Sequence, residues 1–137
     1  NNSSLFINVA LIEDGKPYIG IVYSSRDDIL YYAALDKGAF KTMDHQKPIA
    51  MKTDTSKAPP SINFRLQGKS NPGYLLCQLA ETRDFGGVMI EGSREWDTAA
   101  GHAILLSLGM NLAESSNDRM VKYNKVKWKN PDIRIIE

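Results

Sequence analysis

Asp97 is the residue of this chain best suited to chemistry, because its carboxylate stands directly before a strongly apolar stretch. That stretch covers residues 98–108, and Gly109 follows it as a stop signal. A helix that is apolar almost all the way round belongs in a protein interior. An acid at its first turn is therefore the N-cap of a buried helix, a metal ligand, or both at once.

The neighbours of Asp97 offer contacts for a phosphorylated substrate. Thr98 presents a hydroxyl beside a helix N-terminus, where backbone N–H groups favour anions, and an ordinary first-turn residue is the alternative. Arg94 and Glu95 are candidate contacts for a nucleotide. An exposed ion pair or a solvated turn is the safer expectation for these two side chains.

Four further residues near this motif or on the preceding helix have simpler expected roles. Trp96 is expected to anchor the core, and Gly101 to permit close helix packing. His102 is expected on a helix face rather than as a catalytic base. Cys77 lies on an apolar helical face and is expected to be a small core residue.

Composition is that of one ordinary globular domain. The 137 residues are 42% hydrophobic and 24% charged, with a formal net charge of +1. This charge gives no general case for nucleic acid or an anionic membrane as a partner, and no apolar run approaches the length of a membrane span. The single cysteine excludes an internal disulfide and fits a reducing compartment, so we expect a cytoplasmic protein.

The elements that must position Asp97 begin with an antiparallel meander. Turn formers separate runs of β-branched and aromatic residues, which predicts short strands joined by hairpins. The first run is apolar on both faces, as is typical of a central strand. Strands are expected over residues 5–12, 18–23, 29–32 and 39–41.

The second half of the chain alternates strands with helices. Pro72 suits the first turn of a helix over residues 72–84, which the pair Gly86-Gly87 is expected to end. A meander followed by such alternation predicts an α+β or α/β layered sandwich. We expect a remaining N-terminal lobe over residues 1–60 and a C-terminal α/β lobe over 61–137. Further strands are expected over 62–66, 88–90 and 132–136, with a connection or sheet edge over 42–60.

Several stretches resemble the inositol monophosphatase superfamily, most closely its 3′(2′),5′-bisphosphate nucleotidase branch. Residues 95–103 are similar to the family's second signature, Trp-Asp-x-Ala-Ala-Gly, and this match is specific. Residues 6–23 look like the family's central hairpin. Weaker matches at Gly38-Ala39-Phe40, at 77–81 and at 129–133 extend the resemblance to the C-terminus. The resemblance implies a truncated inositol-monophosphatase-like fold.

The chain also departs from the family's pattern. The first signature, Asp-Pro-x-Asp-Gly-Thr, should lie just before residue 1, and neither it nor the upstream helix with a metal-binding Glu is present. Residues 71–75 replace a Gly-Ser-Ser-Leu-Lys-like stretch, and 87–89 replace a Tyr-Pro-Arg-like triplet. Phosphate- and base-contacting roles at those positions therefore do not carry over.

The resemblance implies chemistry with Mg²⁺. Hydrolysis of a phosphate monoester needs an activated water and neutralised phosphoryl oxygens, and two or three Mg²⁺ ions held by carboxylates supply both. The resemblance assigns one metal to Asp97, shared with two Asp residues of the missing segment. A single carboxylate cannot hold a catalytic cluster, so we expect no complete catalytic set and weak or no activity from this chain alone.

The function that the resemblance implies is a Mg²⁺-dependent phosphatase acting on the 3′-phosphate of adenosine 3′,5′-bisphosphate or its sulfated precursor, linked to sulfur assimilation. An inositol-phosphate phosphatase is the alternative enzyme. A non-catalytic remnant or split-enzyme half, acting as a binding or assembly module, is the alternative from another class. Because loss of half a bilobed fold leaves apolar sheet uncovered, a homodimer or a partner chain supplying the missing lobe is also expected.

Overall fold

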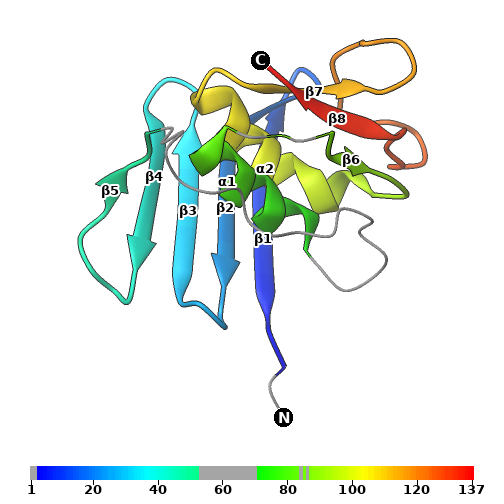
Figure 1. Ribbon diagram of the computed structural model, residues 1–137. Helices are drawn as coiled ribbons and strands as arrows, with labels where there is room; N and C mark the ends of the chain where they lie inside the picture. Colours follow the sequence, from blue (N-terminus) through cyan, green and yellow to red (C-terminus); the bar gives the residue numbers. More distant parts are fainter. Residues whose placement is uncertain (1–2, 53–70, 84, 86) are drawn as a thin grey trace.

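The large sheet of the protein is the meander that the sequence predicts. The structure is a computed structural model and describes residues 3–52, 71–83, 85 and 87–137. Five antiparallel strands follow one another in the order β1-β2-β3-β4-β5 (Figure 1). They are β1 (Phe6–Glu13), β2 (Lys16–Ser24), β3 (Ile29–Ala34), β4 (Gly38–Met43) and β5 (Ile49–Ala50), so the four predicted strands are confirmed.

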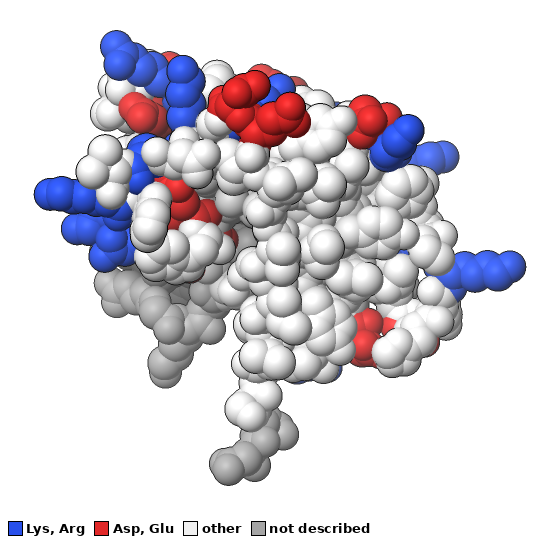
Figure 2. Space-filling model, turned by 180° about the vertical axis from the view of Figure 1, so that it is seen from behind, with Lys and Arg blue, Asp and Glu red and all other residues white. Residues whose placement is uncertain are grey.

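Among the described strands β1 lies at the edge of the large sheet, which contradicts the central position that its pattern predicts. It pairs with β2 alone in the part of the chain that the structure describes, with Val9 opposite Ile21. The residues of β1 are apolar on both faces, but among these strands it has a hydrogen-bonded neighbour along one side only. Ile7, Val9 and Leu11 lie on the sheet face that points away from α2 (Figure 2), and they are 44%, 53% and 52% exposed.

Helix α1 (Pro72–Thr82) begins where the sequence predicts and ends earlier than expected. The Asn71 side chain caps it by accepting a hydrogen bond from the Tyr74 N–H at 3.0 Å, and Pro72 fills the first position. The helix ends at Arg83, which has a left-handed φ of 55° and donates its N–H to the Leu79 carbonyl. The prediction that Gly86-Gly87 ends it is therefore wrong, and Gly86 lies outside the described residues.

Helix α2 (Glu95–Ser107) packs against one face of the large sheet beside α1 (Figure 1). It begins three residues before the predicted stretch. Four small residues lie side by side across the sheet beneath the helices, and small side chains let a helix backbone approach closely. A Cβ on Gly20 would lie 2.3 Å from the Ala100 carbonyl oxygen of α2. The four small residues are Ala10, Gly20, Ala33 and Ala39.

A second, smaller sheet lies at the end of the chain. It has the antiparallel order β6-β8-β7, formed by β6 (Met89–Ile90), β7 (Asn111–Glu114) and β8 (Ile133–Ile136). The predicted strand over 62–66 lies outside the described residues. The layered α+β fold is confirmed, whereas the division into lobes at residue 60 stays a prediction. No helix among the described residues has the length and hydropathy of a membrane span.

Candidate functional site

The first turn of α2 holds Asp97 by a capping box. Arg94 is the N-cap, and its backbone N–H donates to Oδ2 of Asp97 at 2.7 Å. Asp97 is thus the third residue of the helix, and the expectation that it is the N-cap itself is wrong. The cause is the earlier start of the helix, whose first residue, Glu95, donates its N–H to the Trp128 carbonyl at 3.0 Å.

The Asp97 carboxylate keeps one oxygen available. Among the described residues Oδ1 accepts no hydrogen bond, and the side chain is half-buried beside the positive end of the helix dipole. Trp96, next to it, is 59% exposed, so the prediction of a core anchor is wrong. Its ring instead meets that of Trp128 edge to face, with 6.5 Å between centroids.

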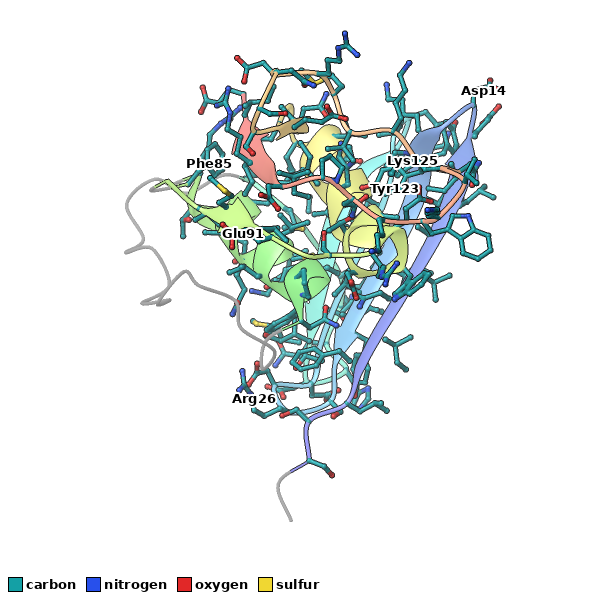
Figure 3. All side chains as sticks on the ribbon, turned by 90° about the vertical axis from the view of Figure 1, so that its right-hand side faces the viewer. Asp14, Arg26, Phe85, Glu91, Tyr123 and Lys125 are labelled. Atoms are coloured by element: carbon teal, nitrogen blue, oxygen red, sulfur yellow. The ribbon has the colours of Figure 1, made fainter. Side chains whose placement is uncertain are left out.

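Glu95 is buried and fastens a distant segment to the start of α2. Its carboxylate accepts hydrogen bonds from the backbone N–H groups of Asn124 and Lys125, both at 2.9 Å, and lies 2.8 Å from the Lys125 ammonium. Figure 3 shows Lys125 and Tyr123 on this segment, beside α2 and β1. Burial opposes ionisation of Glu95, but these donors outweigh it and lower its pKa. The expectation of an exposed ion pair or solvated turn is therefore wrong for Glu95.

Asn130 is a second buried residue that links the C-terminal part of the chain to the start of α2, and the sequence alone does not predict this role. The two N–H groups of its buried amide are shared among the Ser93 hydroxyl at 3.1 Å, the Arg94 carbonyl at 3.0 Å and the Thr98 hydroxyl at 2.9 Å. These bonds hold the turn that presents Asp97. The stretch 129–133 had suggested only the end of a family-like chain, and a lone Asn before Pro131 carries no spacing signal of its own.

Thr98 and His102 belong to a buried row of polar groups. The Thr98 hydroxyl lies 3.2 Å from the Tyr123 hydroxyl, which lies 2.9 Å from Nδ1 of His102. Nε2 of His102 lies 2.7 Å from Oδ1 of Asn111. Burial lowers the pKa of His102 to about 4 and raises that of Tyr123. The Thr98 hydroxyl already has two internal hydrogen-bond partners, so its contact with phosphate stays a prediction. The substrate contacts of Arg94 and Glu95 also stay predictions.

The remaining expectations are mostly confirmed. Gly101 permits close packing, because a Cβ there would lie 2.8 Å from the Gly73 carbonyl oxygen. Cys77 is fully buried in the core. His102 lies on a helix face, but that face is buried, and the residue is 2% exposed.

The described residues do not by themselves fit a complete Mg²⁺ site. Within residues 3–52, 71–83, 85 and 87–137, no group of three or more His, Cys, Asp or Glu side chains is placed to hold a metal ion. Asp97 has the chemistry of one ligand, because a carboxylate oxygen is what Mg²⁺ prefers. Further carboxylates would have to come from outside the described residues.

Comparison with known proteins relates the whole chain to one group of enzymes. A curated 3′(2′),5′-bisphosphate nucleotidase, CysQ of Salmonella typhimurium, is 28% identical over 98% of this chain and 61% of its own length. The CysQ protein of Escherichia coli strain K12 is 26% identical over the same shares. The chain thus spans about three-fifths of the length of these relatives. No family model matches the chain.

Solved structures agree with this relationship. The crystal structure of CysQ from Bacteroides thetaiotaomicron, described as a bacterial member of the inositol monophosphatase family, matches 96% of this chain and 62% of its own with a TM-score of 0.76 and 22% identity. A structure of SaIMPase-II with 2′-AMP bound matches 96% of this chain and 56% of its own, with a TM-score of 0.62 and 18% identity. The resemblance is thereby confirmed: this chain is related to CysQ nucleotidases over nearly its whole length and has the fold of the inositol monophosphatase family.

Proposed function

We propose that this chain is one part of a Mg²⁺-dependent phosphomonoesterase that removes the 3′-phosphate of adenosine 3′,5′-bisphosphate or its sulfated precursor. The observation that carries the proposal is the Asp97 carboxylate at the start of α2, with Oδ2 fixed by the Arg94 N–H and Oδ1 without a hydrogen-bond partner among the described residues. The nucleotidases related to this chain over 98% of its length support the substrate class.

The residues around Asp97 have positioning roles in this proposal. Asn130 holds the turn before α2 through the Arg94 carbonyl, and Glu95 holds residues 124 and 125 against the same turn. Both side chains are buried and hydrogen-bonded, so the carboxylate of Asp97 is presented by a rigid backbone. When bound, Mg²⁺ would supply an activated water and charge neutralisation at the phosphoryl group.

Activity in this proposal requires carboxylates that the described residues do not supply. In this proposal residues 1–137 by themselves are expected to show weak or no phosphate release, and Asp97 supplies one ligand of a shared metal site. A non-catalytic binding or assembly module is the second candidate, favoured by the lack of a metal-ligand cluster in the described part of the chain. An inositol-phosphate phosphatase is the alternative enzyme and differs only in substrate. The structural neighbour SaIMPase-II is described with inositol monophosphate bound and with 2′-AMP bound, which supports a small phosphorylated ligand of either kind.

The deciding experiment supplies the missing part covalently. The segment of the Salmonella typhimurium nucleotidase that this chain does not match is fused to residues 1–137, and phosphate release is measured from adenosine 3′,5′-bisphosphate and from inositol 1-phosphate. We expect release from the bisphosphate that EDTA abolishes and that Asp97→Asn lowers at least 1,000-fold, about 4 kcal/mol in the barrier.

Glu91→Gln is the control for the fusion, because Glu91 is an exposed acid close to the same turn and has no part in the proposed site. It should leave phosphate release unchanged. Release that survives Asp97→Asn would overturn the role of Asp97. A folded fusion that releases phosphate from neither substrate would overturn the enzyme in favour of the non-catalytic module.

A further inference from the structure

A row of hydrogen bonds joins the start of β7 to the turn that presents Asp97. The members of this polar row, in order, are Asn111, His102, Tyr123, Thr98 and Asn130. The four contacts along it measure 2.7, 2.9, 3.2 and 2.9 Å. The last four side chains are at most 8% exposed, so their partners are protein groups rather than bulk water.

Two separate parts of the chain hold the polar row in place. His102 and Thr98 lie on α2, whereas Tyr123 belongs to the segment that passes the first hairpin (Figure 3). The Tyr123 N–H donates to the Gly15 carbonyl at 2.9 Å, and its ring centroid lies 5.5 Å from that of His102. The Tyr123 hydroxyl therefore has a fixed place between two side chains of α2.

The direction of each bond in the polar row follows when the row is traced from Asn130. An amide N–H can only donate, so the Thr98 oxygen accepts from Asn130. The Thr98 hydroxyl has one proton, and the other partner that the structure gives it is the Tyr123 oxygen. Tyr123 then donates its own proton to Nδ1 of His102. Both hydroxyl protons therefore point away from the turn before α2.

The Arg94 carbonyl is the group at which this direction matters. It accepts hydrogen bonds from the Asn130 amide and from the Asp97 N–H, both at 3.0 Å. The Arg94 N–H in turn donates to Oδ2 of Asp97 at 2.7 Å. The backbone of Arg94 thus sets the direction of the Asp97 carboxylate, and whatever holds its carbonyl also holds the proposed metal ligand.

The Thr98 hydroxyl is a competitor for the same carbonyl. Thr98 follows the N-cap Arg94 by four residues, and a threonine hydroxyl in a helix can donate to the carbonyl four residues earlier. A Thr98 proton turned that way would displace the Asn130 amide. The polar row prevents this, because Tyr123 accepts the Thr98 proton. Without an acceptor at His102, the Tyr123 proton would instead point at the Thr98 oxygen.

We propose that His102 and Tyr123 are positioning residues for Asp97. They keep the Thr98 proton away from the carbonyl at the start of α2, and the backbone there keeps the carboxylate of Asp97 aimed at its metal. Both act through the polar row rather than by contact with metal or substrate. The inference deepens the proposed function and rests on it in one respect, because Mg²⁺ is the ion for which Asp97 is positioned.

Two replacements of His102 separate the direction of the row from its contribution to stability. His102→Asn places an amide oxygen close to the position of Nδ1, so Tyr123 keeps its acceptor. His102→Leu removes the acceptor and suits the apolar surroundings of the helix. Tyr123→Phe removes the middle of the row. Each variant of residues 1–137 is compared with the parent chain by amide hydrogen exchange at pH 7.

The Arg94 N–H is the reporter, because its acceptor is the Asp97 carboxylate. The Ile104 N–H, in the interior of α2, reports on the stability of the helix as a whole. Relative to Ile104, His102→Leu and Tyr123→Phe should speed exchange at Arg94 about tenfold. His102→Asn should exchange at Arg94 at the parent rate.

Tyr31→Phe is the matched control, because Tyr31 is also a buried tyrosine and its hydroxyl is hydrogen-bonded to Glu81, outside the polar row. It should leave exchange at Arg94 unchanged. Parallel changes at Arg94 and Ile104 in every variant would overturn the inference and leave the row a purely structural one. Unchanged exchange at Arg94 in His102→Leu, or equal effects of Asn and Leu at this position, would also overturn it.

Phosphate release by the fusion described above separates this inference from the proposed function. The fusion that carries His102→Leu should need about tenfold more Mg²⁺ for half-maximal release than the fusion that carries Tyr31→Phe. An equal Mg²⁺ requirement would overturn the inference. The expected exchange in residues 1–137 together with an inactive fusion would overturn only the proposed function.

Discussion

The side chains of Tyr123 and His102 meet inside the protein, with the phenolic oxygen 2.9 Å from Nδ1 of the imidazole. The direction of this bond follows from its neighbours. Oδ1 of Asn111 already accepts a hydrogen bond from the Leu112 N–H, so it also acts as the acceptor toward Nε2 of His102. Nε2 of His102 therefore carries the ring proton, and Nδ1 accepts a hydrogen bond from the Tyr123 hydroxyl. The row of polar groups is therefore satisfied only while His102 is neutral.

The neutral state of His102 predicts a loss of stability in mild acid. Its pKa is about 4 in the folded protein and about 6.5 when exposed, so the unfolded chain takes up the proton first. The contribution of neutral His102 is complete above pH 6.5 and is lost as the pH falls toward 4. Urea unfolding should show about 2 kcal/mol less stability at pH 5 than at pH 7 from this group alone.

Two histidine variants isolate this effect. His102→Gln should remove about 2 kcal/mol of the difference between pH 7 and pH 5, since Gln does not titrate. His45→Gln is the control, because that side chain is exposed and its ion-pair partner among the described residues is Asp28 at the surface. An equal reduction in both variants would contradict the role of His102.

Asp97 has a structural role that can be separated from metal binding. Asp97→Ala removes the acceptor for the Arg94 N–H and should lower the free energy of unfolding by about 1 kcal/mol. Asp97→Asn keeps an acceptor and should cost about 0.5 kcal/mol through the lost charge at the helix N-terminus. Urea denaturation measures both, with Glu91→Ala as an exposed control. Equal destabilisation by Asn and Ala would contradict the capping geometry.

The sequence predicted those features that depend on nearby residues. Asn71 and Pro72 start α1, Asp14 and Gly15 turn the first hairpin, and the Trp-Asp motif lies at the start of α2. Each of these depends on a few neighbouring positions, and turn and cap chemistry is local.

Features that join distant segments were not predictable from one sequence. Glu95 meets residues 124 and 125, and Asn130 meets Thr98, across about thirty positions of chain. Burial of these groups is what makes the contacts matter, and burial is decided by packing rather than by local pattern. The edge position of β1 was missed for another reason: its residues carry the pattern of a central strand, whereas its pairing depends on a neighbour that the described strands do not provide.

Removing the charge of Glu95 should loosen the segment that it fastens. Glu95→Gln keeps the size of the side chain but supplies one acceptor where the carboxylate supplies two, so one of the two N–H groups loses its partner. We expect about 2 kcal/mol less stability and at least tenfold faster hydrogen exchange at the amides of Asn124 and Lys125. Glu91→Gln should leave both amides unchanged, and unchanged exchange in Glu95→Gln would contradict the fastening.

Gly20 should tolerate no side chain, because α2 crosses the sheet directly above it. A Cβ there would lie 2.3 Å from the Ala100 carbonyl oxygen and 2.8 Å from Cβ of Ala103, and backbone atoms cannot rotate away. Gly20→Ala should therefore cost about 3 kcal/mol in urea unfolding, at the upper end of overpacking effects. Gly92→Ala is the comparison: its Cβ would meet nothing within 4 Å, and its φ of 64° costs about 1 kcal/mol of backbone strain alone. If the two variants were equally stable, the close approach of α2 to β2 would be refuted.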